Sequence, residues 1–111
     1  TAVGGSGNWE IVRNDLTSGS GPVNYGDKIK LVNQYSPAKG YLETCGNVYN
    51  TGFGVQTSSK PNRDGGSGTW EIVRNDLTSG SGPVNYGDKI KLVNQYSPAK
   101  GYLETCGNVY N

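Results

Sequence analysis

The chain has 111 residues, a formal net charge of +1 and no histidine. That length suits one ordinary domain, and the hydrophobic content is only 32%. With 10 basic and 9 acidic residues in near balance, the sequence lacks the concentrated positive face that nucleic-acid binding needs. No apolar stretch approaches the length of a membrane span, and no signal peptide is visible. We therefore expect neither nucleic acid nor a membrane as partner, while the localisation stays open.

The apolar residues form short alternating runs between clusters of Gly, Asn, Asp, Ser and Pro, which is typical of an all-β protein. Alternation with one apolar side predicts half-buried antiparallel strands. A helix is disfavoured, because no window places apolar residues at helical spacing. In chain order, the first four strand candidates are Trp9–Asn14, Asp27–Asn33, Gly40–Thr44 and Gly54–Ser59.

The connections between these strands contain turn residues. Pro37 suits the second position of a type I turn, and we expect Gly40 to take the left-handed conformation that completes a bulged hairpin. Gly26 and Asp27 predict a tight entry into the second strand. The glycine-rich segments do not indicate a phosphate loop, because no helix follows whose N-terminus could hold a phosphate.

An internal repeat is the strongest signal in the sequence. Residues 4–50 align with residues 65–111 at an offset of 61, with 51–64 as the joining segment, and only one position differs: Asn8 becomes Thr69. Surface positions tolerate substitution at little cost, so natural copies usually drift apart there. The near-identity indicates either a very recent duplication or an engineered, idealised symmetric protein, and we favour the second.

The order "VNYGDKIKLVNQYSPAKGYLET", then "VQTSS", then "GSGTWEI" resembles one lobe of a β-trefoil of the MIR type over nearly the whole chain. The Gln-x-Trp signature of ricin-type trefoil lectins is absent. The resemblance implies three four-strand lobes, with six strands in a barrel and six in a cap of hairpins. The residues that carry it are Val23, Tyr25, Gly26, Asp27, Leu31, Tyr41, Leu42, Thr44, Trp70 and Ile72. The core that it implies comprises Ile29, Leu31, Leu42, Val55, Trp70 and Ile72, with Trp9, Ile11, Ile90, Leu92 and Leu103 as symmetry mates.

The number of strands has a consequence for assembly. Seven strand candidates can be counted in the chain, whereas a trefoil needs twelve. With one further strand, the chain would hold two four-strand lobes of about 61 residues each. Open sheet edges and apolar faces recruit partners. We therefore expect a homo-oligomer that completes the trefoil. A trimer that shares its lobes between two trefoils satisfies the count.

Nothing in the sequence favours an enzyme, a cofactor or a metal site. The usual general base is missing without histidine, and neither Cys45 nor Cys106 has a histidine to activate it. One cysteine per repeat is not a disulfide framework, and we expect free thiols. No dense run of Asp residues suggests calcium. We expect solvated or turn-forming roles for the carboxylates of the first period, which are Glu10, Asp15, Asp27, Glu43 and Asp64.

Two functions remain from different classes. The repeat and the incomplete lobe count favour a symmetric, self-assembling scaffold, designed or idealised, without catalytic activity. The alternative is a carbohydrate-binding lectin with one shallow site per lobe, as the resemblance implies, because aromatic plates beside amides suit sugars. The same residues could instead cover the barrel and satisfy loop backbone. The candidate glycan-binding residues are Asn33, Gln34, Tyr35, Tyr41, Asn47 and Tyr49, with second copies at Asn94, Gln95, Tyr96, Tyr102, Asn108 and Tyr110.

Overall fold

The computed structural model describes residues 4–17, 19–35, 39–47, 52–78, 80–96 and 100–105. Within these ranges the chain is all-β, as the sequence predicts, and it contains no helix that could cross a membrane. The strands found there are β1 (Trp9–Arg13), β2 (Lys28–Asn33), β3 (Tyr41–Asn47), β4 (Phe53–Ser58), β5 (Trp70–Arg74) and β6 (Ile90–Asn94).

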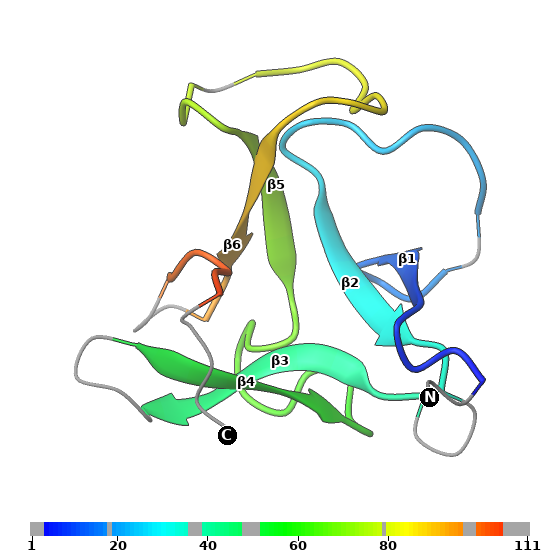
Figure 1. Ribbon diagram of the computed structural model, residues 1–111, viewed down its shortest axis with the longest axis vertical. Helices are drawn as coiled ribbons and strands as arrows, with labels where there is room; N and C mark the ends of the chain where they lie inside the picture. Colours follow the sequence, from blue (N-terminus) through cyan, green and yellow to red (C-terminus); the bar gives the residue numbers. More distant parts are fainter. Residues whose placement is uncertain are drawn as a thin grey trace.

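The strands form one open antiparallel sheet in the order β4-β3-β2-β5-β6, and β1 pairs with β2 outside this path. β2 is the central strand (Figure 1). One of its edges pairs with β1 along the whole of β1. Its other edge is shared, because Val32 pairs with Tyr41 of β3 while Ile29 pairs with Trp70 of β5. The arrangement of these strands as lobes of a β-trefoil stays a prediction.

The repeat of the sequence appears as two hairpins with the same register. Trp9 pairs with Asn33 in the β1–β2 hairpin, and Trp70 pairs with Asn94 in the β5–β6 hairpin. The register of a hairpin follows from its hydrophobic alternation, and the two hairpins have the same alternation. Figure 1 shows them on either side of a central space, with the β3–β4 hairpin across one end.

The predicted seventh strand, around Leu103, is not formed within the described residues. In the first copy, β3 pairs with β4 from Tyr41 to Asn47, with an irregularity after Thr44, and meets β2 only at Val32. In the second copy, Tyr102 makes a single bridge to Val93. The sequence of β4, FGVQTS, occurs only once. The second copy therefore lacks the partner that extends β3 in the first.

The hydrophobic core lies where the first copy of the repeat meets the second. Its buried members are Tyr25, Ile29, Trp70 and Ile72. The predicted core residues Leu31, Leu42 and Leu92 are partly buried against this cluster, together with Val23 and Val84. Five others are wrong as core predictions, because they are between 37% and 51% exposed: Trp9, Ile11, Val55, Ile90 and Leu103.

The hairpin between β2 and β3 differs from the prediction in one detail. Lys39, not Gly40, has the left-handed conformation, with a φ of 41°. Gly40 is needed for another reason: a Cβ there would lie 2.7 Å from the Cβ of Thr57 on β4. The glycine thus permits close packing of β3 against β4. The predicted turn at Pro37 lies outside the described residues.

Candidate functional site

The candidate site is the contact between the two repeat copies, here called the repeat junction, which consists of Tyr25 and Ile29 from the first copy and Trp70, Ile72, Arg74 and Asp88 from the second. The Tyr25 hydroxyl donates a hydrogen bond of 2.8 Å to Asp88 Oδ2. The Arg74 guanidinium lies 4.2 Å from the centroid of the Tyr25 ring, which is a cation–π distance. One tyrosine is therefore held by both a cation and an anion of the neighbouring copy.

These polar contacts change the acidity of both partners. The pKa of Asp88 is lowered, first by the backbone N–H of Asn85 and then by the Tyr25 hydroxyl. The pKa of Tyr25 is raised, mainly because its hydroxyl donates to the Asp88 carboxylate. Both shifts favour the state in which a neutral tyrosine faces a charged aspartate.

The backbone joins the copies as well. Gly26 N donates to Ile72 O at 2.8 Å, and Ile72 N donates to Asp27 O at 3.1 Å. Tyr25 N donates to Gly82 O at 3.0 Å. The indole nitrogen of Trp70 donates to Leu42 O at 3.0 Å, so β3 also takes part. The junction has the apolar centre and satisfied backbone of a protein core.

The repeat counterparts of the junction residues are uncovered. Trp70 is 1% exposed, but its counterpart Trp9 is 40% exposed. Ile72 is 3% exposed, and its counterpart Ile11 is 51% exposed. We call Trp9 and Ile11 the leading face.

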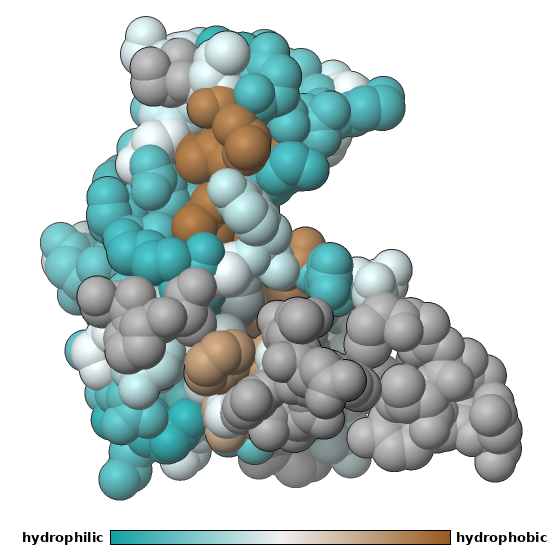
Figure 2. Space-filling model, turned by 90° about the vertical axis from the view of Figure 1, so that its left-hand side faces the viewer, coloured by the Kyte–Doolittle hydropathy of each residue, from teal (hydrophilic) through white to brown (hydrophobic). Residues whose placement is uncertain are grey.

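The counterparts of the first-copy residues are exposed as well. Tyr25 is buried in the junction, whereas Tyr86 is fully exposed. Ile90 and Leu103 are also exposed. We call Tyr86, Ile90 and Leu103 the trailing face. Hydrophobic residues lie open on the side of the molecule where β6 and residues 100–105 are located (Figure 2).

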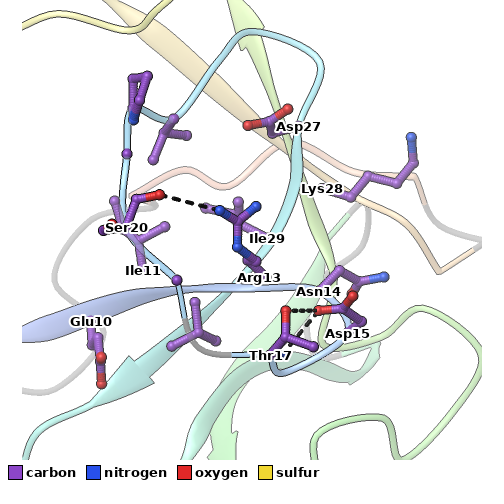
Figure 3. A pocket seen from close by; sticks show the side chains of 15 residues that line it. Glu10, Ile11, Arg13, Asn14, Asp15, Thr17, Ser20, Asp27, Lys28 and Ile29 are labelled. Carbon is purple, nitrogen blue, oxygen red and sulfur yellow. Dashed lines mark hydrogen bonds between the residues drawn. The ribbon is translucent and has the colours of Figure 1, made fainter.

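An open pocket of about 510 Å³ lies beside β1. Arg13 from β1 and Asp27 from the turn before β2 line it, together with residues 19–23 (Figure 3). Arg13 Nη2 donates to Ser20 O at 3.3 Å. Asp27 Oδ2 accepts from Asn24 N at 2.9 Å. A cation and an anion are therefore fixed at the wall of a pocket that the sequence did not reveal.

A buried polar network supports the first copy beneath the junction. Lys30 Nζ donates to Pro61 O at 2.8 Å and to the Thr69 hydroxyl at 3.1 Å, and burial lowers its pKa. The Glu43 side chain is completely buried, so its expected solvated role was wrong. Its Oε2 accepts from Arg63 Nε at 2.8 Å. These contacts hold the joining segment, residues 51–64, against β2 and β3.

The expected turn role holds for Asp15, whose carboxylate accepts from both the hydroxyl and the backbone N–H of Thr17. Among the described residues, no three His, Cys, Asp or Glu side chains gather as metal ligands would. Cys45 is a free thiol, and Cys106 lies outside the described residues.

The amides among the predicted glycan-binding residues have partners within the chain. Asn33 Nδ2 donates to Ser6 O at 2.9 Å, and its Oδ1 accepts from Tyr35 N at 2.9 Å. Asn94 repeats this arrangement with Ser67 O and Tyr96 N. The two glutamines, Gln34 and Gln95, each donate to a backbone carbonyl two residues earlier and accept from a lysine five residues later.

The remaining predicted residues are placed as follows. Tyr35, Tyr41 and Tyr96 are partly buried, and Tyr102 is exposed. Asn47 ends β3. The bridges from Val32 to Tyr41 and from Val93 to Tyr102 bring one tyrosine of the second predicted cluster close to the first cluster in each copy. Tyr49, Asn108 and Tyr110 lie outside the described residues, and glycan binding stays a prediction.

No protein family, curated protein or solved structure matches the chain. Function therefore has to be argued from the geometry of the junction and its uncovered counterparts. The sequence did hold one signal for this site: the offset of 61 assigns a counterpart to each junction residue, including Tyr25, which the sequence marked only as part of the trefoil resemblance.

Proposed function

We propose that the chain is a self-assembling, idealised β-trefoil protein whose copies complete one another's uncovered repeat junctions, and that it has no catalytic activity. The observation that carries this proposal is the contrast between Trp70, buried at 1% exposure, and its counterpart Trp9, exposed at 40%. The sequences around the two tryptophans differ only in the preceding residue, which is Asn8 in the first copy and Thr69 in the second. Their difference in burial therefore reflects the presence or absence of a neighbouring repeat.

The energetics favour covering these faces. Burial of one Ile side chain stabilises by about 1.5–3 kcal/mol, and aromatic side chains bury more area still. The leading face leaves Trp9 and Ile11 exposed, and the trailing face leaves Tyr86 and Ile90 exposed. Association that buries all four side chains stabilises the assembly by several kcal/mol. The loss of translational and rotational freedom of the associating chains opposes this gain.

The trefoil arrangement limits the possible assemblies. A trefoil has three lobes, and each chain supplies two repeat copies. Three chains hold six repeat copies, which equals the number of lobes in two trefoils, so a trimer is the assembly that we propose; a strand equivalent to β4 is then still needed beside each second copy. The contact joins two different faces, and such contacts close into rings or extend as filaments.

Light scattering during size-exclusion chromatography tests the proposal. The expected mass is three times the chain mass of 11.8 kDa, and the oligomer should dissociate on dilution. Ile11→Lys should yield monomers, because it places a charge on the leading face while Ile72 keeps the internal junction. Ser59→Lys adds the same charge at an exposed position of the joining segment and should not change the mass. A wild-type monomer at all concentrations contradicts the proposal.

The internal hydrogen bonds of the asparagines and glutamines favour assembly over the lectin alternative, because a sugar would have to compete for these amides. A glycan array separates the two functions. Saturable binding of one glycan class by both the wild type and Ile11→Lys would restore the lectin interpretation.

A further inference from the structure

Tyr25 of the first copy lies in a site formed by residues of the second copy. The open pocket beside β1 is the equivalent site of the first copy. Residues 23–26 are held in the second copy through contacts with Ile72, Arg74, Gly82, Pro83, Val84 and Asp88. An offset of 61 converts these residues into Ile11, Arg13, Gly21, Pro22, Val23 and Asp27. All six line the open pocket.

Arg13 and Asp27 of the open pocket already have the arrangement of their counterparts Arg74 and Asp88, which hold Tyr25. Arg74 Nη2 donates to Ser81 O at 3.1 Å, and Arg13 Nη2 donates to Ser20 O at 3.3 Å. Asp88 Oδ2 accepts from Asn85 N at 2.9 Å, just as Asp27 Oδ2 accepts from Asn24 N at 2.9 Å. The pocket is therefore preorganised, which lowers the entropic cost of binding.

The chain also carries the matching occupant. Tyr25 lies within the sequence VNYGD, and the same five residues surround Tyr86. Tyr86 is fully exposed, so it does not enter the pocket of its own chain. We propose that Tyr86 of one copy docks into the pocket between Arg13 and Asp27 of a second copy, and that this contact sets the register of assembly. The inference rests on the proposed function and names the contact that performs it.

The docked geometry follows from the internal junction. The Tyr86 hydroxyl donates to Asp27 Oδ2, as Tyr25 donates to Asp88 Oδ2, and its ring lies beneath Arg13. Gly87 N reaches Ile11 O, as Gly26 N reaches Ile72 O. Within the described chain, Ile11 makes no bond of this kind. The contact is directional: the trailing face of each copy meets the leading face of the next.

Complementary variants test this direction. Tyr86→Ala removes the occupant and keeps the pocket, whereas Arg13→Glu damages the pocket and keeps the occupant. Each variant alone should have the mass of a single chain. An equimolar mixture should yield a species with one chain of each kind, because Tyr86 of the Arg13→Glu chain finds an intact pocket. If the mixture has only the masses of its separate components, the proposal is wrong.

A second measurement separates this proposal from the proposed function. Tyr86→Phe loses only the hydroxyl, so its association should weaken about tenfold, as expected for one hydrogen bond to a charged group. Tyr25→Phe makes the matched change inside the chain, so it should lower the thermal stability of the single chain. A wild type that never associates refutes the proposed function itself. If the wild type associates and Tyr86→Ala associates equally well, only the Tyr86 contact is refuted.

The fold of each variant can be checked independently. The buried Trp70 should give blue-shifted emission in every folded chain, since its junction lies within one copy of the protein. If Tyr86→Ala fails to fold, the tenfold loss expected for Tyr86→Phe still decides the question. Unchanged association of a folded Tyr86→Phe chain would contradict the hydroxyl contact.

Discussion

The indole nitrogen of Trp70 donates a hydrogen bond to the carbonyl oxygen of Leu42, 3.0 Å away, and this bond ties β5 to β3. Trp9 has the same neighbours in sequence except for the preceding residue, Asn8 in place of Thr69, yet it is exposed. Most positions of the chain have such a counterpart, and several of these pairs lie in different environments. A substitution and its counterpart therefore differ in tertiary surroundings while the local sequence stays the same, and the predictions below use this property.

Gly40→Ala should destabilise the protein by about 1–3 kcal/mol, the usual cost of overpacking, because the new Cβ would lie 2.7 Å from the Cβ of Thr57. Gly101→Ala makes the same change where no atom lies within 4 Å. We expect it to be neutral or to stabilise by a few tenths of a kcal/mol. Urea unfolding of the two variants measures the difference, and equal free energies of unfolding would contradict the close approach of β3 and β4.

Lys30→Met should lower the free energy of unfolding by about 1–3 kcal/mol, because it leaves buried acceptors at Pro61 and Thr69 without their donor. The counterpart Lys91 is only partly buried and makes no side-chain hydrogen bond within the described chain. Lys91→Met should change stability by less than about 0.5 kcal/mol. Calorimetry at one fixed concentration compares the two variants. A larger loss for Lys91→Met would show that the lysine network has been assigned to the wrong copy.

Arg63→Leu should lower the free energy of unfolding, since it removes the Nε donor from the fully buried Glu43 and leaves that charge without its ionic partner. The Arg63 side chain itself is 37% exposed, which limits the effect. Adding Glu43→Gln should recover part of the loss, because it removes the stranded charge. Glu104→Gln, at the exposed counterpart, serves as the control and should leave stability unchanged. Chemical denaturation that shows no recovery in the double variant would argue against a charged Glu43.

Asp76 should titrate below its ordinary range near 3.9, because the hydroxyl and then the backbone N–H of Thr78 donate to its carboxylate. A depressed pKa in the folded state contributes stability above the unfolded pKa, and that stability is lost as the pH falls through the folded pKa. Thr78→Ala should raise the pKa of Asp76 while Asp15, paired with Thr17, keeps its low value. Carbon-detected NMR titration reads both carboxylates in one sample. A simultaneous rise at Asp15 would show that the turns are not independent.

Much of the sheet follows from the sequence because hydrophobic alternation determines which face of a strand is covered. Ile29 and Ile72 are buried as this pattern predicts. The same pattern failed for Glu43, which was expected in solvent, because Arg63 from the joining segment folds over it. Such a contact depends on tertiary structure and leaves no mark in the alternation of β3.

The candidate site was largely missed for a related reason. The sequence pattern pointed to ligand-binding side chains, and the asparagines among them, Asn33 and Asn94, are engaged within the chain. The junction depends instead on which copy of a residue has a neighbour. Local sequence cannot distinguish Tyr25 from Tyr86, because both lie in VNYGD.

The one position at which the repeat copies differ lies at their contact. Thr69 donates from its hydroxyl to Asn14 Oδ1 at 2.7 Å and accepts from Lys30 Nζ at 3.1 Å, whereas its counterpart Asn8 is exposed. In every other residue the β5–β6 hairpin is chemically interchangeable with β1–β2. During folding, a hairpin from a neighbouring molecule can therefore take the inner place with native side chains throughout. The side chain of one residue, Thr69 in place of an asparagine, is all that distinguishes the chain's own β5–β6 hairpin from a β1–β2 hairpin that replaces it.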